Sequence, residues 1–211
     1  MVAGSRIPQR NRREQRRAEI AQQLLEATER LMAGGLSFTE LSVDRLATEA
    51  AISRATFYIY FEDKRQLLLE FTRQVTDELS KAAALWFDVA EQPTPEIARR
   101  SVRQIIEVYR RHQAVLAAMF ELASYDPVVA EAHMAIVKNV AEQAKSALDR
   151  AVAAGATGPA HSWETSCALT WMIERTCHQM VRNSPTEADD AIAEALTEII
   201  WRTWYLESTS R

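Results

Sequence analysis

Apolar residues near the start of the chain recur with the period of an α-helix. Between Glu14 and Met32 they fall three or four positions apart, which places them on one helix face. These positions are Ile20, Leu24, Leu25, Ala27, Thr28 and Leu31. The 211 residues include only 5 Gly and 6 Pro, and strand-like alternation of apolar and polar residues is missing. The sequence therefore predicts an all-α fold.

Capping residues and helix breakers divide the chain into about nine helices. Gly34 and Gly35 end the first helix, and Ser42 and Ser53 are each suited to cap a short helix. Asp63 then precedes a long fourth helix. Later boundaries are marked by Thr94 with Pro95, Asp126 with Pro127, and GATGP at 155–159. The pattern predicts three short helices followed by six mostly longer ones.

Charge is distributed unevenly along the chain. Residues 1–65 hold 11 Lys and Arg against 9 Asp and Glu, whereas the remainder holds 14 against 20. The first 17 residues alone hold six Arg and one Glu. Such an asymmetry is typical of an arm that binds a polyanion such as DNA, attached to an acidic body. Composition alone leaves a second interpretation open, a disordered solubilising tail.

The stretch FYIYF at 57–61 would by residue preference pass for a strand, but it lies in a helix-turn-helix pattern. Successive residues of a helix differ by about 100°, so Phe57 and Phe61 share one face while Tyr58 points elsewhere. We expect the two phenylalanines to anchor a short helix and the other side chains to be presented to a partner.

The stretch LSVDRLATEAAISRATFYIYFEDKRQLL at 41–68 resembles the signature of TetR-type transcriptional regulators. The resemblance implies a basic flexible arm at 1–13, a helix-turn-helix DNA-binding domain at 14–63, and a ligand-binding and dimerisation domain at 64–211. It also implies a homodimeric regulator, more often a repressor, that releases a near-palindromic DNA operator when a small molecule binds. LTWMIERT at 169–176 and WxxWY near the end resemble the branch of ethionamide-resistance regulators, more weakly.

Carried over residue by residue, the resemblance assigns seven positions to DNA. A guanidinium binds guanine through two hydrogen bonds, small residues permit close approach, and tyrosine, lysine and helix N-termini suit phosphates. Core packing with a wet hydroxyl is the alternative for the tyrosines. The DNA-binding candidates are Ser42, Arg54, Ala55, Thr56, Tyr58, Tyr60 and Lys64.

Two positions depart from the family pattern. Ala51 occupies a turn position where relatives usually have glycine, so we expect strain there if the turn needs a positive φ. Ile59 replaces a residue that is often polar or aromatic. It either meets a thymine methyl or packs inside the protein, and the sequence does not choose.

The resemblance also implies a small-molecule pocket in the body. Its candidate lining is aromatic and methionine-rich, which suits a lipophilic effector, although each such residue taken alone is more often core. The candidates are Trp86, Phe87, Ile105, Tyr109, Met119, Phe120, Met134, Trp171, Met172 and Ile173. Three polar residues lie close by in the sequence, Glu174, Arg175 and His178. They form either an ion pair that faces solvent or the dimer partner, or a contact with the ligand.

Large apolar residues of the last two predicted helices suit a homodimer interface, namely Trp163, Trp201, Trp204 and Tyr205. The histidines and the two cysteines lack metal-ligand spacing, and no phosphate loop or nucleophile motif is found. We therefore expect a regulator without a cofactor or metal and without enzymatic activity. No apolar run is long enough to span a membrane, and we expect a cytoplasmic protein. An all-helical ligand-binding protein or enzyme, and a helical adaptor that binds only protein, remain as alternatives.

Overall fold

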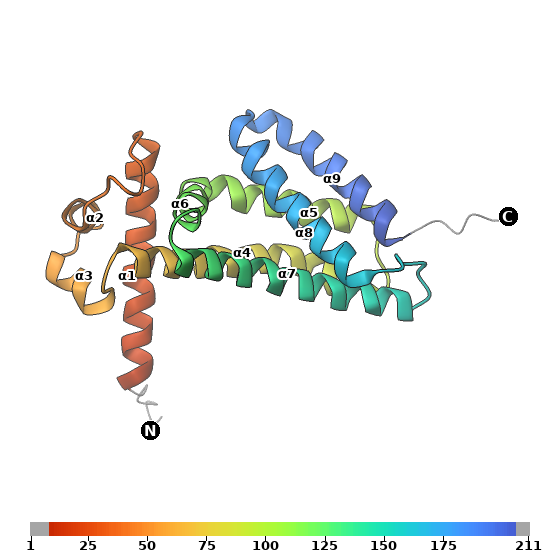
Figure 1. Cartoon of the computed structure of the whole chain (residues 1–211), viewed down its shortest axis with the longest axis horizontal. Coiled ribbons are helices and arrows are strands. Elements are labelled where there is room, and N and C mark those ends of the chain that lie inside the picture. The colour runs from red at the N-terminus through yellow and green to blue at the C-terminus, as the bar shows by residue number, and fades with distance from the viewer. Residues whose placement is uncertain (1–8, 206–211) are drawn as a thin grey trace, which may run out of the picture. The chain divides into compact units, whose positions relative to one another are not determined.

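The computed structural model describes residues 9–205, and within this range the fold is all-helical, as predicted. Nine α-helices and two short 3-10 helices follow one another along these residues (Figure 1). They are α1 (Gln9–Ala33), α2 (Val43–Glu49), α3 (Arg54–Tyr60), α4 (Lys64–Phe87), α5 (Pro95–Arg111), α6 (Gln113–Ala123), α7 (Pro127–Ala153), α8 (Ser162–Gln179), η1 (Val181–Asn183), η2 (Thr186–Ala188) and α9 (Asp189–Trp204).

One expectation about the N-terminus changes. Residues 9–13, assigned above to a flexible arm, form the first turns of α1. The rest of the predicted arm, 1–8, lies outside the described residues. Arginine is a good helix former, so a basic sequence does not prevent the helix from extending N-terminally.

The chain divides into two compact units, one that ends at Arg73 and one that begins at Gln74. We call them the head unit and the body unit. α4 contributes its first residues to the head unit and the rest to the body unit.

The head unit is built from α1, α2, α3 and the start of α4. Its core is apolar, and α2 packs against both α1 and α3. The predicted caps are confirmed, since the Ser42 hydroxyl accepts the Arg45 amide at 3.2 Å and the Ser53 hydroxyl accepts the Thr56 amide at 3.0 Å. These bonds fix the start of each short helix. The length and direction of α2 and α3 are therefore set by local chemistry.

The turn between α2 and α3 contains the only non-glycine residue with positive φ among residues 9–205. Ala51 has φ of +54°, so the left-handed turn that the sequence suggested is present. A residue with a Cβ is strained in this conformation by roughly 1–2 kcal/mol.

We expect Ala51→Gly to raise the free energy of unfolding by about 0.5–1 kcal/mol. Relief of the left-handed strain exceeds the extra chain entropy that glycine brings to the unfolded state, about 0.4–1 kcal/mol. Differential scanning calorimetry should show a melting temperature higher by about 1–4 °C. Ala55→Gly, at an exposed helical position of α3, should lower it instead. A lower melting temperature for Ala51→Gly would contradict this account of the turn.

The body unit packs its helices in antiparallel pairs. α7 lies along α8, and α5 lies along α9 (Figure 1). The predicted caps at Thr94 and Asp126 are again confirmed by side chains that accept amides of α5 and α7. Near the start of α9, the buried Asp189 accepts two hydrogen bonds from the Arg110 Nε, at 3.1 and 3.2 Å, and one from Nη2 at 2.7 Å. This bidentate pair attaches α9 to α5.

Candidate functional site

The helix-turn-helix of the head unit is held from behind by two aromatic rings. Phe57 and Phe61 are fully buried, and their ring centroids lie 5.7 Å apart. They come from the same face of α3 and its C-cap, as the helical spacing predicts. This face of α3 is therefore part of the core, and the opposite face is free to contact another molecule.

The outer face of α3 carries four exposed side chains, Arg54, Ala55, Tyr58 and Ile59, which we call the reading face. Tyr58 is 47% exposed and Ile59 is 61% exposed, so neither packs inside this chain. For Ile59 this removes one of the two interpretations left open by the sequence. Thr56 is half-buried, and its hydroxyl lies 2.8 Å from that of Ser53. It lies at the edge of the reading face.

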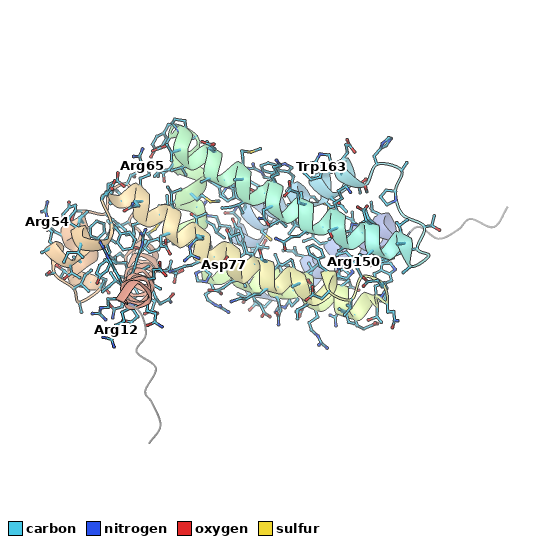
Figure 2. All side chains as sticks on the ribbon, turned by 90° about the horizontal axis from the view of Figure 1, so that it is seen from below. Arg12, Arg54, Arg65, Asp77, Arg150 and Trp163 are labelled. Atoms are coloured by element: carbon cyan, nitrogen blue, oxygen red, sulfur yellow. The ribbon has the colours of Figure 1, made fainter. Side chains whose placement is uncertain are left out.

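Arg54 is paired within the chain. Figure 2 labels Arg54 at the outer side of the head unit. Its Nη1 donates to Asp44 Oδ2 of α2 at 2.7 Å, and its guanidinium lies 5.6 Å from the centroid of the Tyr58 ring. Hydrogen bonding to Asp44 is the main reason why the pKa of Arg54 is raised above its ordinary value. Asp44 is not among the DNA-binding candidates of the sequence, although its carboxylate lies beside the guanidinium expected to bind a base.

The Lys64 ammonium is bound to carbonyl groups of its own chain. Its ammonium donates to three carbonyl oxygens of the segment between α1 and α2, those of Leu41 at 2.6 Å, Thr39 at 3.0 Å and Phe38 at 3.1 Å. Partial burial lowers the pKa of this ammonium. All three of its donors are in use, so the side chain connects the first residue of α4 to the chain just before Ser42.

The other two DNA candidates of the head unit keep solvent contact. Tyr60 is half-buried at the end of α3. Ser42 is exposed, and its hydroxyl is used as the N-cap of α2. The structure thus places six of the seven candidates on α3 or at the start of α2, whereas Lys64 begins α4 and its side chain points inward.

The candidate pocket residues fall into two groups in the body unit. In the first, Trp86 and Phe87 of α4 pack on Trp204 of α9, with ring centroids 4.5 and 5.9 Å from its ring. Trp86 Nε1 also donates to the Tyr205 hydroxyl at 3.2 Å. This group is a closed aromatic core, because Trp204 is only 1% exposed within its own chain. Trp204, expected at a dimer interface, is thus covered without a partner.

The second group contains Tyr109 of α5, Phe120 of α6 and Trp171 of α8, which are linked through two histidines. Phe120 contacts His178 and His133 with centroid distances of 4.2 and 5.1 Å. The His133 ring meets the Trp171 ring edge-on at 5.8 Å, and the Tyr109 hydroxyl lies 3.1 Å from His178 Nδ1. The remaining pocket candidates are Met119, which is buried, Ile105, Met172 and Ile173, which are half-buried, and Met134, which is exposed.

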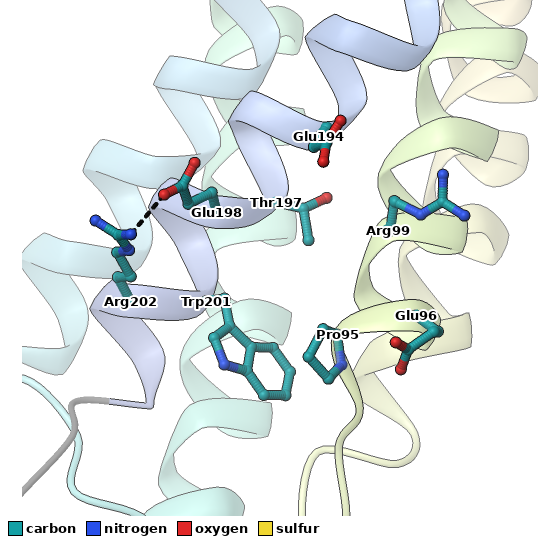
Figure 3. Close-up of a pocket in the computed structure, with 8 residues that line it drawn as sticks. All are labelled: Pro95, Glu96, Arg99, Glu194, Thr197, Glu198, Trp201 and Arg202. Atoms are coloured by element: carbon teal, nitrogen blue, oxygen red, sulfur yellow. Dashed lines mark ion pairs between the residues drawn. The ribbon is translucent and has the colours of Figure 1, made fainter.

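A groove of about 430 Å³ lies between the first turn of α5 and α9. The Trp201 ring points toward Pro95 across it, and Glu198 is paired with Arg202 at 2.6 Å on its other side (Figure 3). Trp201, Tyr205 and Trp163 are all half-buried in the single chain. These three dimer candidates therefore retain surface that another molecule could cover.

Within residues 9–205, no group of three or more His, Cys, Asp or Glu side chains is arranged to hold a metal ion. The search for long apolar helices in the same range also finds none that could cross a membrane. Cys167 and Cys177 are free thiols. The distinctive features are thus the reading face of the head unit and the aromatic and polar groups of the body unit.

The head unit is similar to a known protein family. Residues 24–71 match the family described as bacterial regulatory proteins, tetR family. The segment covers α2, α3 and parts of α1 and α4, so it includes the whole reading face.

Curated relatives extend the likeness beyond the head unit. The chain is 43% identical over 72 residues to the HTH-type transcriptional regulator EthR of Mycolicibacterium smegmatis, a match that covers 34% of this chain and 31% of that one. It is 31% identical over 141 residues to EthR of Mycobacterium tuberculosis, covering 65% and 64%. The chain thus spans less than two thirds of the length of either relative. Both are transcriptional regulators, and neither description names an enzyme.

The fold is shared with solved structures. The transcriptional regulator FadR from Bacillus subtilis, solved in complex with stearoyl-CoA, aligns with a TM-score of 0.67 at 14% identity, over 85% of this chain and 96% of that one. At this identity the likeness concerns the fold alone.

The small helical head with its helix-turn-helix, followed by a larger helical body, defines a class of one-chain DNA-binding regulatory proteins. Together with the match of residues 24–71 and the EthR relatives, this architecture supports a regulator of the TetR type that is similar to EthR.

Proposed function

We propose that the protein is a homodimeric repressor that binds a near-palindromic operator and releases it when an amphiphilic small molecule binds the body unit. The observation that carries the DNA-binding part is the reading face of α3, where Arg54, Tyr58 and Ile59 are exposed opposite the buried Phe57. A helix with one face fixed in the core and the other free can enter a major groove.

Each residue of the reading face has a chemical role in this proposal. Arg54 leaves Asp44 to bind guanine through two hydrogen bonds, while Ala55 permits close approach and Ile59 contacts a thymine methyl. The hydroxyls of Tyr58 and Tyr60 bind phosphate oxygens, as does the N-terminal turn of α2 at Ser42. Thr56 contacts the edge of the same site.

The DNA-binding part is tested on an operator selected from random-sequence DNA with the purified protein. We expect Arg54→Ala to weaken operator binding by about tenfold to a hundredfold and to relax preference at one base pair, since a bidentate contact discriminates by roughly 1–3 kcal/mol. Tyr60→Phe should weaken binding to all sequences more uniformly. Fluorescence anisotropy on a set of single-base operator variants measures both effects.

The control is Lys138→Ala, which removes a positively charged side chain that is 67% exposed on α7, a helix that is not part of the proposed dimer contact. It should leave operator affinity unchanged. If Arg54→Ala binds every operator variant as the unaltered protein does, α3 is not the reading helix.

Two body-unit helices suit the dimer part of the proposal. Ile199 of α9 is exposed, and Met180 is exposed directly after α8. With Trp163 and Trp201 half-buried, this surface is more apolar than a monomer needs. A two-fold contact through α8 and α9 would supply two head units for two half-sites.

The ligand-response part rests on the body's aromatic groups and on an analogy. FadR from Bacillus subtilis, which shares the fold, was solved with stearoyl-CoA. A molecule with an apolar chain suits the rings of Phe120 and Trp171, which are half-buried and reachable from solvent. To release DNA, the molecule must bind the DNA-incompetent arrangement more tightly than the competent one. α4 is the proposed coupling element, because one continuous helix runs from Lys64 to Phe87.

A further inference from the structure

The body unit contains a carboxylate whose surroundings are aromatic. Glu174 lies on the side of α8 that faces α7, with Oε1 3.3 Å from His133 Nε2. The rings of Phe120 and Trp171 flank His133, at 5.1 and 5.8 Å between centroids. The histidine that Glu174 contacts on α7 therefore lies between a ring of α6 and a ring of α8.

Glu174 points inward, and its charge contributes to the raised pKa of two neighbouring groups. Its side chain is only 15% exposed. Burial raises the pKa of the Cys177 thiol to about 12, with the charge of Glu174 as the next largest cause. The pKa of the Tyr109 hydroxyl is likewise raised, first by burial and then by Cys177 and Glu174. A carboxylate that affects both groups lies in the interior of the body unit.

The polar atoms of this pair lack hydrogen bonds. Neither oxygen of Glu174 accepts a hydrogen bond, and the 3.3 Å contact between Glu174 Oε1 and His133 Nε2 is not a hydrogen bond, although His133 is only 9% exposed. Arg175 does not supply the missing donor. Its Nε is 3.7 Å from Glu174 Oε2, and its guanidinium lies over the Phe120 ring with 57% of the side chain exposed.

Asp189, a second buried carboxylate of the body unit, accepts hydrogen bonds, unlike Glu174. Asp189 accepts three hydrogen bonds from Arg110, and Arg103 approaches it as well. An unsatisfied buried acceptor destabilises the folded protein, and it does so more strongly when it is charged. Such a group in a folded protein calls for a specific explanation, for example a bound molecule.

The missing partner has a definable chemistry. Two carboxylate oxygens and an imidazole nitrogen that accepts when neutral call for a group with several N–H donors and a positive charge. Aromatic rings nearby attract organic cations and pack against alkyl chains. An anionic head group would be repelled, and an alcohol would offer only one donor.

We propose that Glu174 and His133 bind the ammonium head of a cationic amphiphile, with its apolar chain against Phe120 and Trp171. This inference rests on the proposed function, because it names the chemical class of the effector. It narrows the lipophilic molecule expected from the sequence to one with a positively charged amine.

The test compares three probes of equal chain length on the purified full chain, namely decylammonium, decanol and decanoate, each below its micelle concentration. Isothermal titration calorimetry should give decylammonium an affinity at least tenfold higher than decanol, with decanoate the weakest. Glu174→Gln should weaken decylammonium binding at least tenfold and leave decanol binding unchanged. The matched control is Glu164→Gln, which changes an exposed glutamate of the same helix and should have no effect.

A second readout needs no probe. Because Glu174→Gln removes a buried charge that accepts no hydrogen bond, the ligand-free variant should melt at the same temperature as the unaltered protein or higher. The inference is overturned if the three probes bind equally or if Glu174→Gln keeps full affinity for decylammonium. It is also overturned if that variant melts lower or loses its dimer by light scattering, because Glu174 would then have a structural partner.

Operator binding separates this inference from the proposed function. If decylammonium binds through Glu174 but leaves operator affinity unchanged, the site stands and the ligand-release proposal fails. If decanol or decanoate releases the operator and decylammonium does not, the release proposal stands and the ammonium site fails.

Discussion

Lys64→Met is expected to lower both the melting temperature and the operator affinity while leaving the salt dependence of DNA binding unchanged. The Lys64 ammonium holds the carbonyls of Phe38, Thr39 and Leu41, and methionine leaves all three without this donor. Hydrogen bonds to a charged group contribute about 1.5–3 kcal/mol each before solvent takes over part of the loss. We expect a net destabilisation of about 2–3 kcal/mol and a melting temperature lower by roughly 4–12 °C.

Operator affinity should fall about tenfold in this variant, because the segment before Ser42 loses its fixed position and the competent arrangement becomes a minor one. The slope of log K against log salt distinguishes this role from a phosphate contact. Loss of one phosphate contact reduces the slope by about 0.9, whereas loss of a positioning residue leaves it unchanged. Affinity measured at several salt concentrations gives the slope directly.

Two further variants complete the Lys64 experiment. Arg65→Met removes the same charge from the next residue, whose side chain is 47% exposed, and should barely affect melting. Lys64→Arg keeps the charge, but a planar guanidinium cannot direct its donors as the ammonium does, so it should recover little stability. A reduced slope for Lys64→Met, together with full activity of Lys64→Arg, would return Lys64 to the phosphate role that the family resemblance implied.

Arg110→Ala is expected to be among the most destabilising single changes in the body unit. Asp189 is 3% exposed, and after this change only Arg103 Nη1, at 3.4 Å, remains near its carboxylate. Removing one partner of a buried ion pair leaves the other charge uncompensated, which destabilises by roughly 3–5 kcal/mol. Because Arg103 partly compensates the charge of Asp189, we expect a loss of stability near the lower end of this range. The melting temperature should then be lower by about 6–12 °C.

The neighbouring arginine provides the control for this prediction. Arg111 is also paired, with Glu78 at 2.7 Å, but its side chain is 60% exposed. An exposed pair contributes less than about 1 kcal/mol, so Arg111→Ala should lower the melting temperature by no more than about 4 °C. Equal losses for the two variants in calorimetry would show that the Asp189 pair does not hold α9 to α5.

Features that depend on neighbouring residues could be predicted from the sequence. The caps at Ser42, Ser53 and Thr94 follow from side chains that reach an amide three residues away. The left-handed turn at Ala51 is instead an expectation from the family resemblance, because TetR-type relatives usually have glycine at this position. The anchoring of α3 by Phe57 and Phe61 followed from helical periodicity.

Features that join distant residues could not be predicted in the same way. Lys64 meets carbonyls 23 to 26 positions earlier, and Arg110 meets Asp189 across 79 positions. No local pattern in one sequence indicates such a partner. The split of the pocket candidates has the same origin, since Trp86 and Phe87 were grouped with Phe120 by residue type, whereas α9 brings Trp204 onto them.

The pairing of Arg54 with Asp44 affects how the protein would search a genome. In the proposed complex, Arg54 would have to give up a carboxylate 2.7 Å away before it could bind a base, and that carboxylate would then lie near the negatively charged DNA. Only a guanine at the right position offers the two acceptors that replace the lost bond. On any other sequence we expect the arginine to stay with Asp44, so that only general attraction to phosphates would hold the head unit on DNA. The residence time on other sequences would then be short. The protein would therefore move quickly between sites until it reaches the operator.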